Sequence, residues 1–275
     1  MKITVLVDNR LKEVNCGLGA EHGLSFHIEH DGKQILCDAG ASGLFMENAS
    51  AMGIDLSACS FAFISHGHND HCGGLPALLE GTTDIPVCLH TAIPGEDYFS
   101  TRRGTHRSLS CDRTVFEKHR RRFRYIDGTT EISTGIFAVQ CKESKNATPH
   151  GNRFLTKKNG ELEIPDDFGH ELSLAFVTKK GLVIVSPCSH CGALNIIDEC
   201  RAATGCTKVH AYIGGLHFVE GVECAAEATE FACGIAAHHP ETTVYTGHCT
   251  CDTALALLEG NPHIKSFATG TIIEI

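Results

Sequence analysis

The sequence predicts an α+β protein in which helices cover two packed β-sheets. Each half of the chain holds a hairpin-like pair of hydrophobic segments, and segments with helical periodicity follow each pair. Two hairpin-plus-helix halves are typical of packed sheets with helices on their outer faces. No internal repeat and no low-complexity linker interrupts the 275 residues, so we expect a single domain over residues 1–275.

The first half contains the clearest strand signal. Residues 24–29 alternate apolar and polar side chains, as a half-buried strand does. Asp31-Gly32 supplies a turn, and residues 34–38 form the returning strand of a hairpin. The other elements expected in this half are a first strand in residues 1–8, a helix over 43–53, a short buried strand over 61–65 and a helix over 75–80.

The second half repeats the pattern. Residues 173–177 and 182–186 form a hairpin around a Lys179-Lys180-Gly181 turn. The elements expected after this hairpin are a helix over 195–204, a strand over 209–213, a helix over 222–237, a strand over 243–246 and a helix over 252–259.

Composition and the first residues indicate a cytoplasmic protein with reduced thiols. No apolar run approaches the ~18 residues that a membrane span needs, and Asp8 ends an apolar stretch too short for a secretory signal. The 15 cysteines are an odd number without an export signal, which argues against a disulfide scaffold. The net charge of −10 disfavours polyanion binding, so we expect no nucleic-acid or membrane partner; the oligomeric state is left open.

Four side chains that bind metals fall within six residues, directly after the strand predicted over 61–65: His66, His68, Asp70 and His71. Imidazole nitrogen and carboxylate oxygen are ligands that Zn²⁺ and Fe²⁺ accept. Residues two apart in an extended stretch point the same way, so His66 and His68 can hold one ion, and Asp70 and His71 can reach a second. The alternative is a histidine-rich surface loop.

Residues 65–74 resemble the HxHxDH-x-GG motif of the metallo-β-lactamase superfamily. Residues 36–40 resemble its first motif, an apolar strand that ends in Asp-x-Gly, where Asp38 would support the metal loop. Residues 187–192, 214–218 and 246–250 are similar to three motifs of one branch, which resembles the dihydropterin-methyl ribofuranosyl-aminobenzene phosphate synthase-like proteins. The resemblance implies a four-layer αββα sandwich with metals at one edge between the sheets.

The resemblance also implies roles for single residues. The first metal would be held by His66, His68 and His190, and the second by Asp70, His71 and His248. His217 would contact the substrate, and His170 competes with His190 as a ligand. The chain departs from the pattern at Pro187 and Cys251, and the segment 182–186 does not end in the Gly-Asp that supplies a bridging aspartate in many superfamily hydrolases.

Basic residues gather between residues 99 and 126, where Lys and Arg exceed Asp and Glu by seven. In the superfamily this region often forms a lid, so we expect a basic lid-like insertion at about 95–130. Guanidinium groups bind phosphate and carboxylate well, which makes Arg102 and Arg103 candidates for substrate binding. The alternative is a solvated helix face around residues 117–122.

Together these features predict a metal-dependent hydrolase of a small anionic substrate, a phosphoester or related ester. Two divalent metal ions, zinc first and iron or manganese as alternatives, would activate water, with Asp70 and His217 as catalytic residues. The first alternative is a pterin-type transferase or synthase acting on a ribosyl-aminobenzene phosphate. The second is a non-catalytic metal or redox sensor.

Cysteines crowd the same motifs, at Cys188, Cys191, Cys249 and Cys251. A thiolate ligand at the metal site is one interpretation, because a nearby cation lowers the pKa of a thiol. Small buried side chains are the interpretation that we favour from the sequence.

Overall fold

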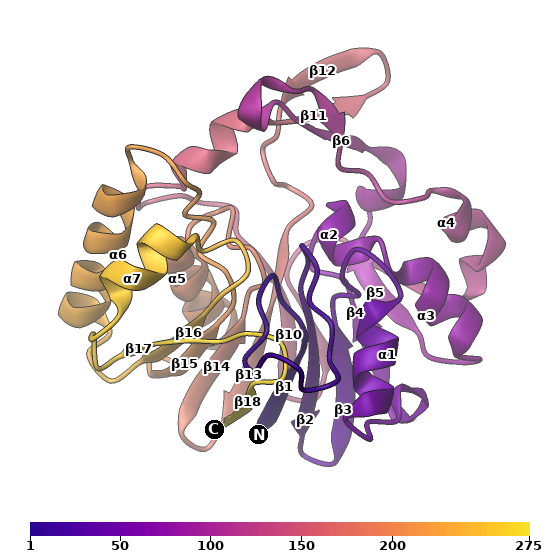
Figure 1. Cartoon of the computed structure of the whole chain (residues 1–275), viewed down its shortest axis with the longest axis horizontal. Coiled ribbons are helices and arrows are strands. Elements are labelled where there is room, and N and C mark those ends of the chain that lie inside the picture. Colours follow the sequence, from indigo (N-terminus) through magenta and orange to yellow (C-terminus); the bar gives the residue numbers. More distant parts are fainter. The chain divides into compact units, whose positions relative to one another are not determined.

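A computed structural model describes residues 1–275, apart from the side chain of Asn159. The chain divides into two compact units, each built around its own β-sheet (Figure 1). Unit 1 comprises Met1–Asp127, Leu155–Asp166 and Ala268–Ile275, and unit 2 comprises Gly128–Phe154 and Asp167–Phe267. The expectation of one domain over residues 1–275 stays a prediction.

The main sheet of unit 1 has the strand order β18-β1-β2-β3-β4-β5-β8. Its strands are β1 (Lys2–Val7), β2 (Ser25–His30), β3 (Lys33–Cys37), β4 (Phe61–Phe63), β5 (Val87–His90), β8 (Phe123–Ile126) and β18 (Ile272–Glu274). β2 and β3 form the predicted hairpin, and β3, β4, β5 and β8 run parallel. Loops that leave the carboxyl ends of parallel strands meet at one sheet edge, where ligands commonly bind.

Helices of unit 1 bury apolar side chains against this sheet. They are α1 (Leu44–Ala51), α2 (Asn69–Cys72), α3 (Leu75–Gly81) and α4 (Thr114–Lys118). Phe45 of α1 and Leu75 and Leu78 of α3 share one buried core with Leu36 and Ala62 of the strands. Removing these apolar side chains from water supplies the driving force that holds the helices on the sheet.

A second, four-stranded sheet of unit 1 was not anticipated from the sequence. Its order is β12-β11-β6-β7, from β6 (Asp97–Ser100), β7 (Arg107–Ser108), β11 (Leu155–Asn159) and β12 (Leu162–Pro165). These strands are short, and β7 and β12 are exposed, so they lack the apolar alternation that reveals a half-buried strand.

The basic segment predicted as a lid-like insertion folds as part of unit 1. It forms β6, a 3₁₀ turn at Arg102–Gly104, β7, α4, a 3₁₀ turn at Arg120–Arg122 and β8. Its last strand pairs with β5 in the main sheet. Residues 117–122 do not form one helix face, because α4 ends at Lys118. Whether the segment acts as a lid stays a prediction.

The sheet of unit 2 has the order β17-β16-β15-β14-β13-β10-β9. Its strands are β9 (Thr130–Ser133), β10 (Ile136–Gln140), β13 (Leu172–Thr178), β14 (Gly181–Val185), β15 (Val209–Ile213), β16 (Thr243–Thr246) and β17 (Ile264–Ser266). β13 and β14 form the second predicted hairpin, while β14 to β17 run parallel. The helices are α5 (Ala193–Thr204), α6 (Cys224–His238) and α7 (Asp252–Leu258).

The elements predicted from hydrophobic periodicity are confirmed with shifted bounds. The helix expected over 195–204 begins two residues earlier, after Gly192, and the helix expected over 222–237 begins at Cys224. Among the residues described, no helix is both long enough and apolar enough to span a membrane.

Candidate metal centre

The histidine cluster of unit 1 occupies the loop between β4 and α2. His68 is the last extended residue before the helix begins at Asn69. A side chain at Gly67 would collide with the ring of Tyr98, so this loop passes too close to Tyr98 for any residue but glycine. Gly67 therefore lets the loop that carries His66 and His68 pack directly against Tyr98.

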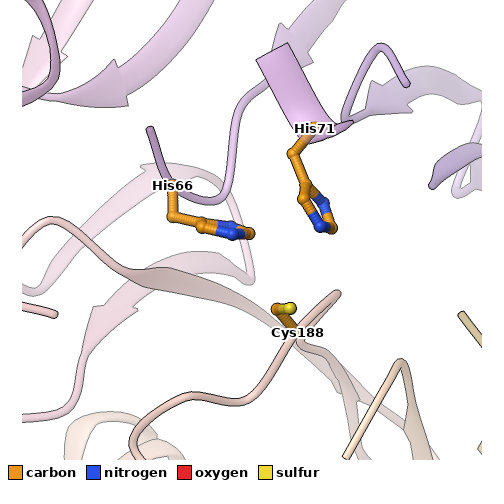
Figure 2. Close-up of side chains that lie close together, drawn as sticks. All are labelled: His66, His71 and Cys188. Carbon is orange, nitrogen blue, oxygen red and sulfur yellow. The ribbon is translucent and has the colours of Figure 1, made fainter. Parts of the chain in front are cut away.

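Three imidazoles of this loop lie in ring contact. The ring centroid of His66 is 4.6 Å from that of His68 and 4.2 Å from that of His71. All three side chains are buried. Figure 2 shows His66 and His71 side by side, one on the loop after β4 and the other on α2; it also labels Cys188, which belongs to unit 2 and is described with it below.

Asp38 orients one of these rings. It follows β3, is fully buried, and has a φ of 60°, a conformation that is costly for a residue other than glycine. Its Oδ1 accepts the Ser65 N–H at 2.7 Å, and its Oδ2 lies 2.6 Å from Nδ1 of His71. A carboxylate on Nδ1 places the proton there, so Nε2 of His71 keeps its lone pair for a metal.

Asp70 lies on the other side of His71. Its Oδ2 is 3.7 Å from Nε2 of His71 and 3.5 Å from Nε2 of His22. Unlike Asp38, Asp70 is partly exposed, with 15% of its side chain accessible. A carboxylate at this place can bind a cation and still contact a solvent molecule or a substrate.

Asp166 is a candidate ligand that the sequence analysis missed. It follows β12, is buried, and its Oδ2 lies 3.6 Å from Nε2 of His68. Tyr98 packs edge-on against His68, with centroids 5.5 Å apart, and donates its hydroxyl to Glu96. Burial raises the pKa of Tyr98, so its phenol stays neutral. The acidic residues before His170 were the only sequence signal for Asp166.

In unit 2, the parallel strands β14, β15 and β16 end next to the remaining predicted residues. Ser189 ties the first two loops together, because its hydroxyl donates to the Gly215 carbonyl at 2.5 Å. Ser189, His217 and His248 all have a positive φ, of 61°, 52° and 50°. Backbone strain at three neighbouring loop ends is typical of sites under functional constraint.

Three neighbouring side chains contact the ring of His190. Its ring stacks on Phe168 with centroids 4.4 Å apart, its Nδ1 lies 3.2 Å from Oδ1 of Asn152, and its ring centroid is 4.3 Å from that of His217. Glu171 accepts the backbone N–H of His190 at 2.8 Å. Burial raises the pKa of Glu171. Asn152 and Glu171 had no motif signal in the sequence.

Cys188, His190 and His217 can bring one ligand atom each to within 4.8 Å of one another, and so can Cys188, His248 and Cys249. Sequence analysis therefore placed His190, His217 and His248 at loops that the structure gathers within unit 2. His170, in the turn before β13, is also buried. The choice between His170 and His190 as a ligand stays a prediction.

Arg102 and Arg103 lie in the 3₁₀ turn between β6 and β7. Arg103 is exposed and has a φ of 65°. Their role in substrate binding stays a prediction.

The donor chemistry fits divalent cations. Unit 1 offers imidazole nitrogen with carboxylate oxygen, and unit 2 offers imidazole nitrogen with sulfur. This mixture suits zinc or ferrous iron better than magnesium or calcium, which prefer oxygen alone.

The comparisons with known proteins agree with this donor chemistry. Residues 18–128 match the family model described as the metallo-beta-lactamase superfamily. A crystal structure described as a metal-dependent hydrolase of the beta-lactamase superfamily has a TM-score of 0.83 and 26% identity, covering 100% of this chain and 99% of that one. The chain is thus similar to the metallo-beta-lactamase superfamily over residues 18–128, and to this hydrolase over its whole length.

Two further similar proteins are a named synthase and a structure that shares the fold. A 7,8-dihydropterin-6-methyl-4-(β-D-ribofuranosyl)-aminobenzene-5'-phosphate synthase of Methanocaldococcus jannaschii is 29% identical, over 86% of this chain and 83% of its own length. Zinc-bound PqqB from Methylobacterium extorquens, at 12% identity, a TM-score of 0.57 and full coverage of both chains, shows the fold alone.

The predicted metallo-β-lactamase-like α+β fold is therefore confirmed. So is the resemblance to the synthase-like branch. Metal binding is a property of the superfamily, and these relatives support an enzyme without deciding between hydrolase and synthase.

Proposed function

We propose that this chain is a metal-dependent hydrolase of a small anionic substrate, a phosphoester or a related ester. The observation that carries the proposal is the buried cluster of His66, His68 and His71, with His71 oriented by Asp38 at 2.6 Å. A supporting carboxylate of this kind is typical of metal-binding histidines. The whole-chain similarity to a metal-dependent hydrolase supports the same conclusion.

The metal ligands that we propose are those of the superfamily resemblance. His66 and His68, with His190, would hold one cation, and Asp70 and His71, with His248, would hold the other. Bound divalent cations lower the pKa of coordinated water and stabilise negative charge that develops on an ester. We propose zinc as the resident metal, and iron or manganese as the alternatives.

The chain's own side chains then have separate tasks. Asp38 keeps a proton on Nδ1 of His71 and fixes the orientation of the ring, so Nε2 is the nitrogen that offers its lone pair. Asp70, partly exposed, is placed to accept a hydrogen bond from an attacking nucleophile. We propose that His217 and the guanidinium groups of Arg102 and Arg103 bind the anionic part of the substrate.

A matched pair of histidine variants tests the proposal. His68→Ala removes a proposed ligand, and His27→Ala removes an equally buried imidazole of unit 1 that instead bonds to Gln34. We expect His68→Ala to lower metal affinity and ester hydrolysis by more than ~100-fold, since even supporting residues are worth 10–100-fold. Elemental analysis and hydrolysis of phosphodiesters and thioesters with Zn²⁺, Mn²⁺ and Fe²⁺ give the readout. If the two variants have the same metal affinity and the same rate of ester hydrolysis, the proposal is wrong.

A synthase is the second candidate, favoured by the 29% identical relative. Unit 2 has a cavity of about 290 Å³, lined by the apolar side chains of Leu194, Phe218 and Phe231 and by Glu227. Phe218 follows His217 directly, so the cavity and a proposed site residue share one loop. A cavity that combines aromatic and aliphatic side chains with the carboxylates of Glu227 and Glu230, near the lower size limit of ligand pockets, suits a flat heterocycle with N–H donors.

A direct assay separates the two candidates. The protein is incubated with a pterin diphosphate and a ribosyl-aminobenzene phosphate, and the products are identified by mass. A joined product that is lost in Phe231→Ala would favour the synthase, whereas hydrolysis alone would favour the hydrolase. The third possibility, a non-catalytic sensor, would show neither reaction with any metal.

A further inference from the structure

The loops after β14 and β16 bring two thiols together with one imidazole. Sγ of Cys188 lies 3.4 Å from Sγ of Cys249. A ring nitrogen of His248 completes a group of three potential ligand atoms, all within 4.8 Å of one another. Cys188 and His248 are only 4% and 2% exposed, and Cys249 is partly buried.

The distance between the sulfurs matches shared coordination of one cation. Two thiolates that each lie ~2.3 Å from a tetrahedral zinc ion are about 3.8 Å apart. The sulfurs of a disulfide are only about 2.05 Å apart. The 3.4 Å between Cys188 and Cys249 is much nearer to the first distance.

The backbone around Cys249 supplies a hydrogen-bond donor to its sulfur. The backbone N–H of His217 donates to Sγ of Cys249 at 3.2 Å. Gly215 approaches the same sulfur so closely that a side chain there would collide with it. Hydrogen bonds to sulfur stabilise metal-bound thiolates, and neighbouring groups of this kind hold ligands in place.

A thiolate ligand also replaces a negatively charged residue that this chain lacks. Many superfamily hydrolases end the strand equivalent to β14 with a Gly-Asp that supplies a negatively charged ligand, and this chain does not. Cys188 comes three residues after the end of β14 at Val185. A thiolate at Cys188 supplies the missing negative charge from the same loop.

We infer that Cys188 and Cys249 are thiolate ligands that act with His248 on a borderline divalent cation, zinc or ferrous iron. The inference rests on the proposed function, because it assigns further ligands to the metal centre of that enzyme. Each thiol gives its proton to solvent when the cation binds. Thiolates select zinc and iron over magnesium and calcium.

Cobalt substitution tests the inference without reference to activity. The full-length protein is stripped of metal under anaerobic conditions and loaded with Co²⁺ alone, and its absorption spectrum is recorded. Thiolate ligation produces an intense sulfur-to-cobalt charge-transfer band in the near ultraviolet. We expect this band in the native chain, a loss of about half its intensity in Cys188→Ser and in Cys249→Ser, and its complete loss in the double variant.

The matched control is Cys224→Ser, whose thiol lies 3.0 Å from that of Cys251 in the same unit. This variant should keep the full band. Thermal melting of each variant shows that it is folded, and iodoacetamide labelling read by mass spectrometry should show that Co²⁺ protects Cys188 and Cys249 in the native chain.

The outcomes of the cobalt experiment distinguish a wrong thiolate assignment from a wrong proposed function. Bound Co²⁺ without a charge-transfer band, or a band unchanged in the double variant, overturns the thiolate assignment and leaves the hydrolase standing. A native chain that binds no Co²⁺, Zn²⁺ or Fe²⁺ overturns both.

Discussion

At the scale of single residues, the proposed metal centre depends on side chains that orient its ligands. Asp38 accepts from the Ser65 N–H and hydroxyl and pairs with His71, so one buried carboxylate links two motifs that are 27 or more positions apart. Its positive φ shows that the backbone accepts a strained conformation to bring the carboxylate there. The metal affinity of His71 should therefore depend on Asp38.

Asp38→Asn is the direct test of that dependence. The amide has the same size but no negative charge, so it holds the Nδ1 proton of His71 less strongly. We expect metal affinity to fall by 10–100-fold, the usual range for such supporting residues. Competition with a chromogenic chelator measures it. An affinity within two-fold of the native chain's would contradict the role of Asp38, and Asp55→Asn, at an exposed 3₁₀ N-cap, is the matched control.

Gly67 and Tyr98 form a second residue-scale pair. Gly67→Ala places a methyl group against the Tyr98 ring, which must shift. Overpacking of this kind costs roughly 1–3 kcal/mol, and the displaced loop should also bind metal more weakly. Urea denaturation with and without Zn²⁺ measures both effects. Tyr98→Leu in the same chain should restore metal binding in part; a Gly67→Ala protein with native affinity would show that the loop tolerates a side chain.

At the scale of elements, the small sheet of unit 1 contains a buried ion pair. Nζ of Lys157 on β11 lies 3.0 Å from Oε1 of Glu96, which directly precedes β6. The two side chains are only 10% and 9% exposed, so either charge alone would be buried without a partner. The pair therefore fixes which strands join in this sheet, and Asp166, at the end of β12, depends on that sheet for its place near His68.

Lys157→Met should be strongly destabilising. It leaves the carboxylate of Glu96 buried without its cation, which typically costs 3–5 kcal/mol in unfolding free energy. The double change Lys157→Met with Glu96→Gln should recover much of the loss. Chemical denaturation provides the comparison, and Lys118→Met, from an exposed pair with Glu80, should change little. If Lys157→Met and Lys118→Met lower the free energy of unfolding by similar amounts, burial gives the Lys157–Glu96 pair no special role.

At the scale of the whole molecule, acid should weaken folding through buried and partly buried histidines. Burial lowers the pKa of His27, His30 and His239 below the ordinary value of 6.5. The unfolded chain therefore takes up protons at higher pH than the folded chain does. The contribution to stability is complete above pH 6.5 and is lost as the pH falls below it.

Denaturation midpoints of the metal-free protein at pH 7.5 and 5.5 measure this effect. We expect a lower free energy of unfolding at pH 5.5, and a smaller difference between the two pH values in His27→Gln. A native chain that is more stable at pH 5.5 would show that other groups dominate its acid response.

The pattern of residues close in sequence was enough to predict many of the strands, helices and site residues. The hairpins β2–β3 and β13–β14, the helices α5 to α7 and the spacing of His66, His68 and His71 all depend on residues close in sequence, so alternation and helical period revealed them. The small sheet was not predicted because its strands are short, β7 and β12 are exposed, and the pairing of β6 with β11 joins residues 55 or more positions apart, such as Ser100 and Leu155.

What the sequence alone determined is the set of ligand types and their arrangement along the chain. Only the tertiary structure decided that Asp38 reaches His71, that Asp166 reaches His68, and that Cys188 meets Cys249 across 61 positions. The physical reason is that strand order and loop conformation, and not spacing in sequence, set the distance between side chains on different strands. The favoured sequence interpretation of these cysteines, as small buried side chains, could not include that contact.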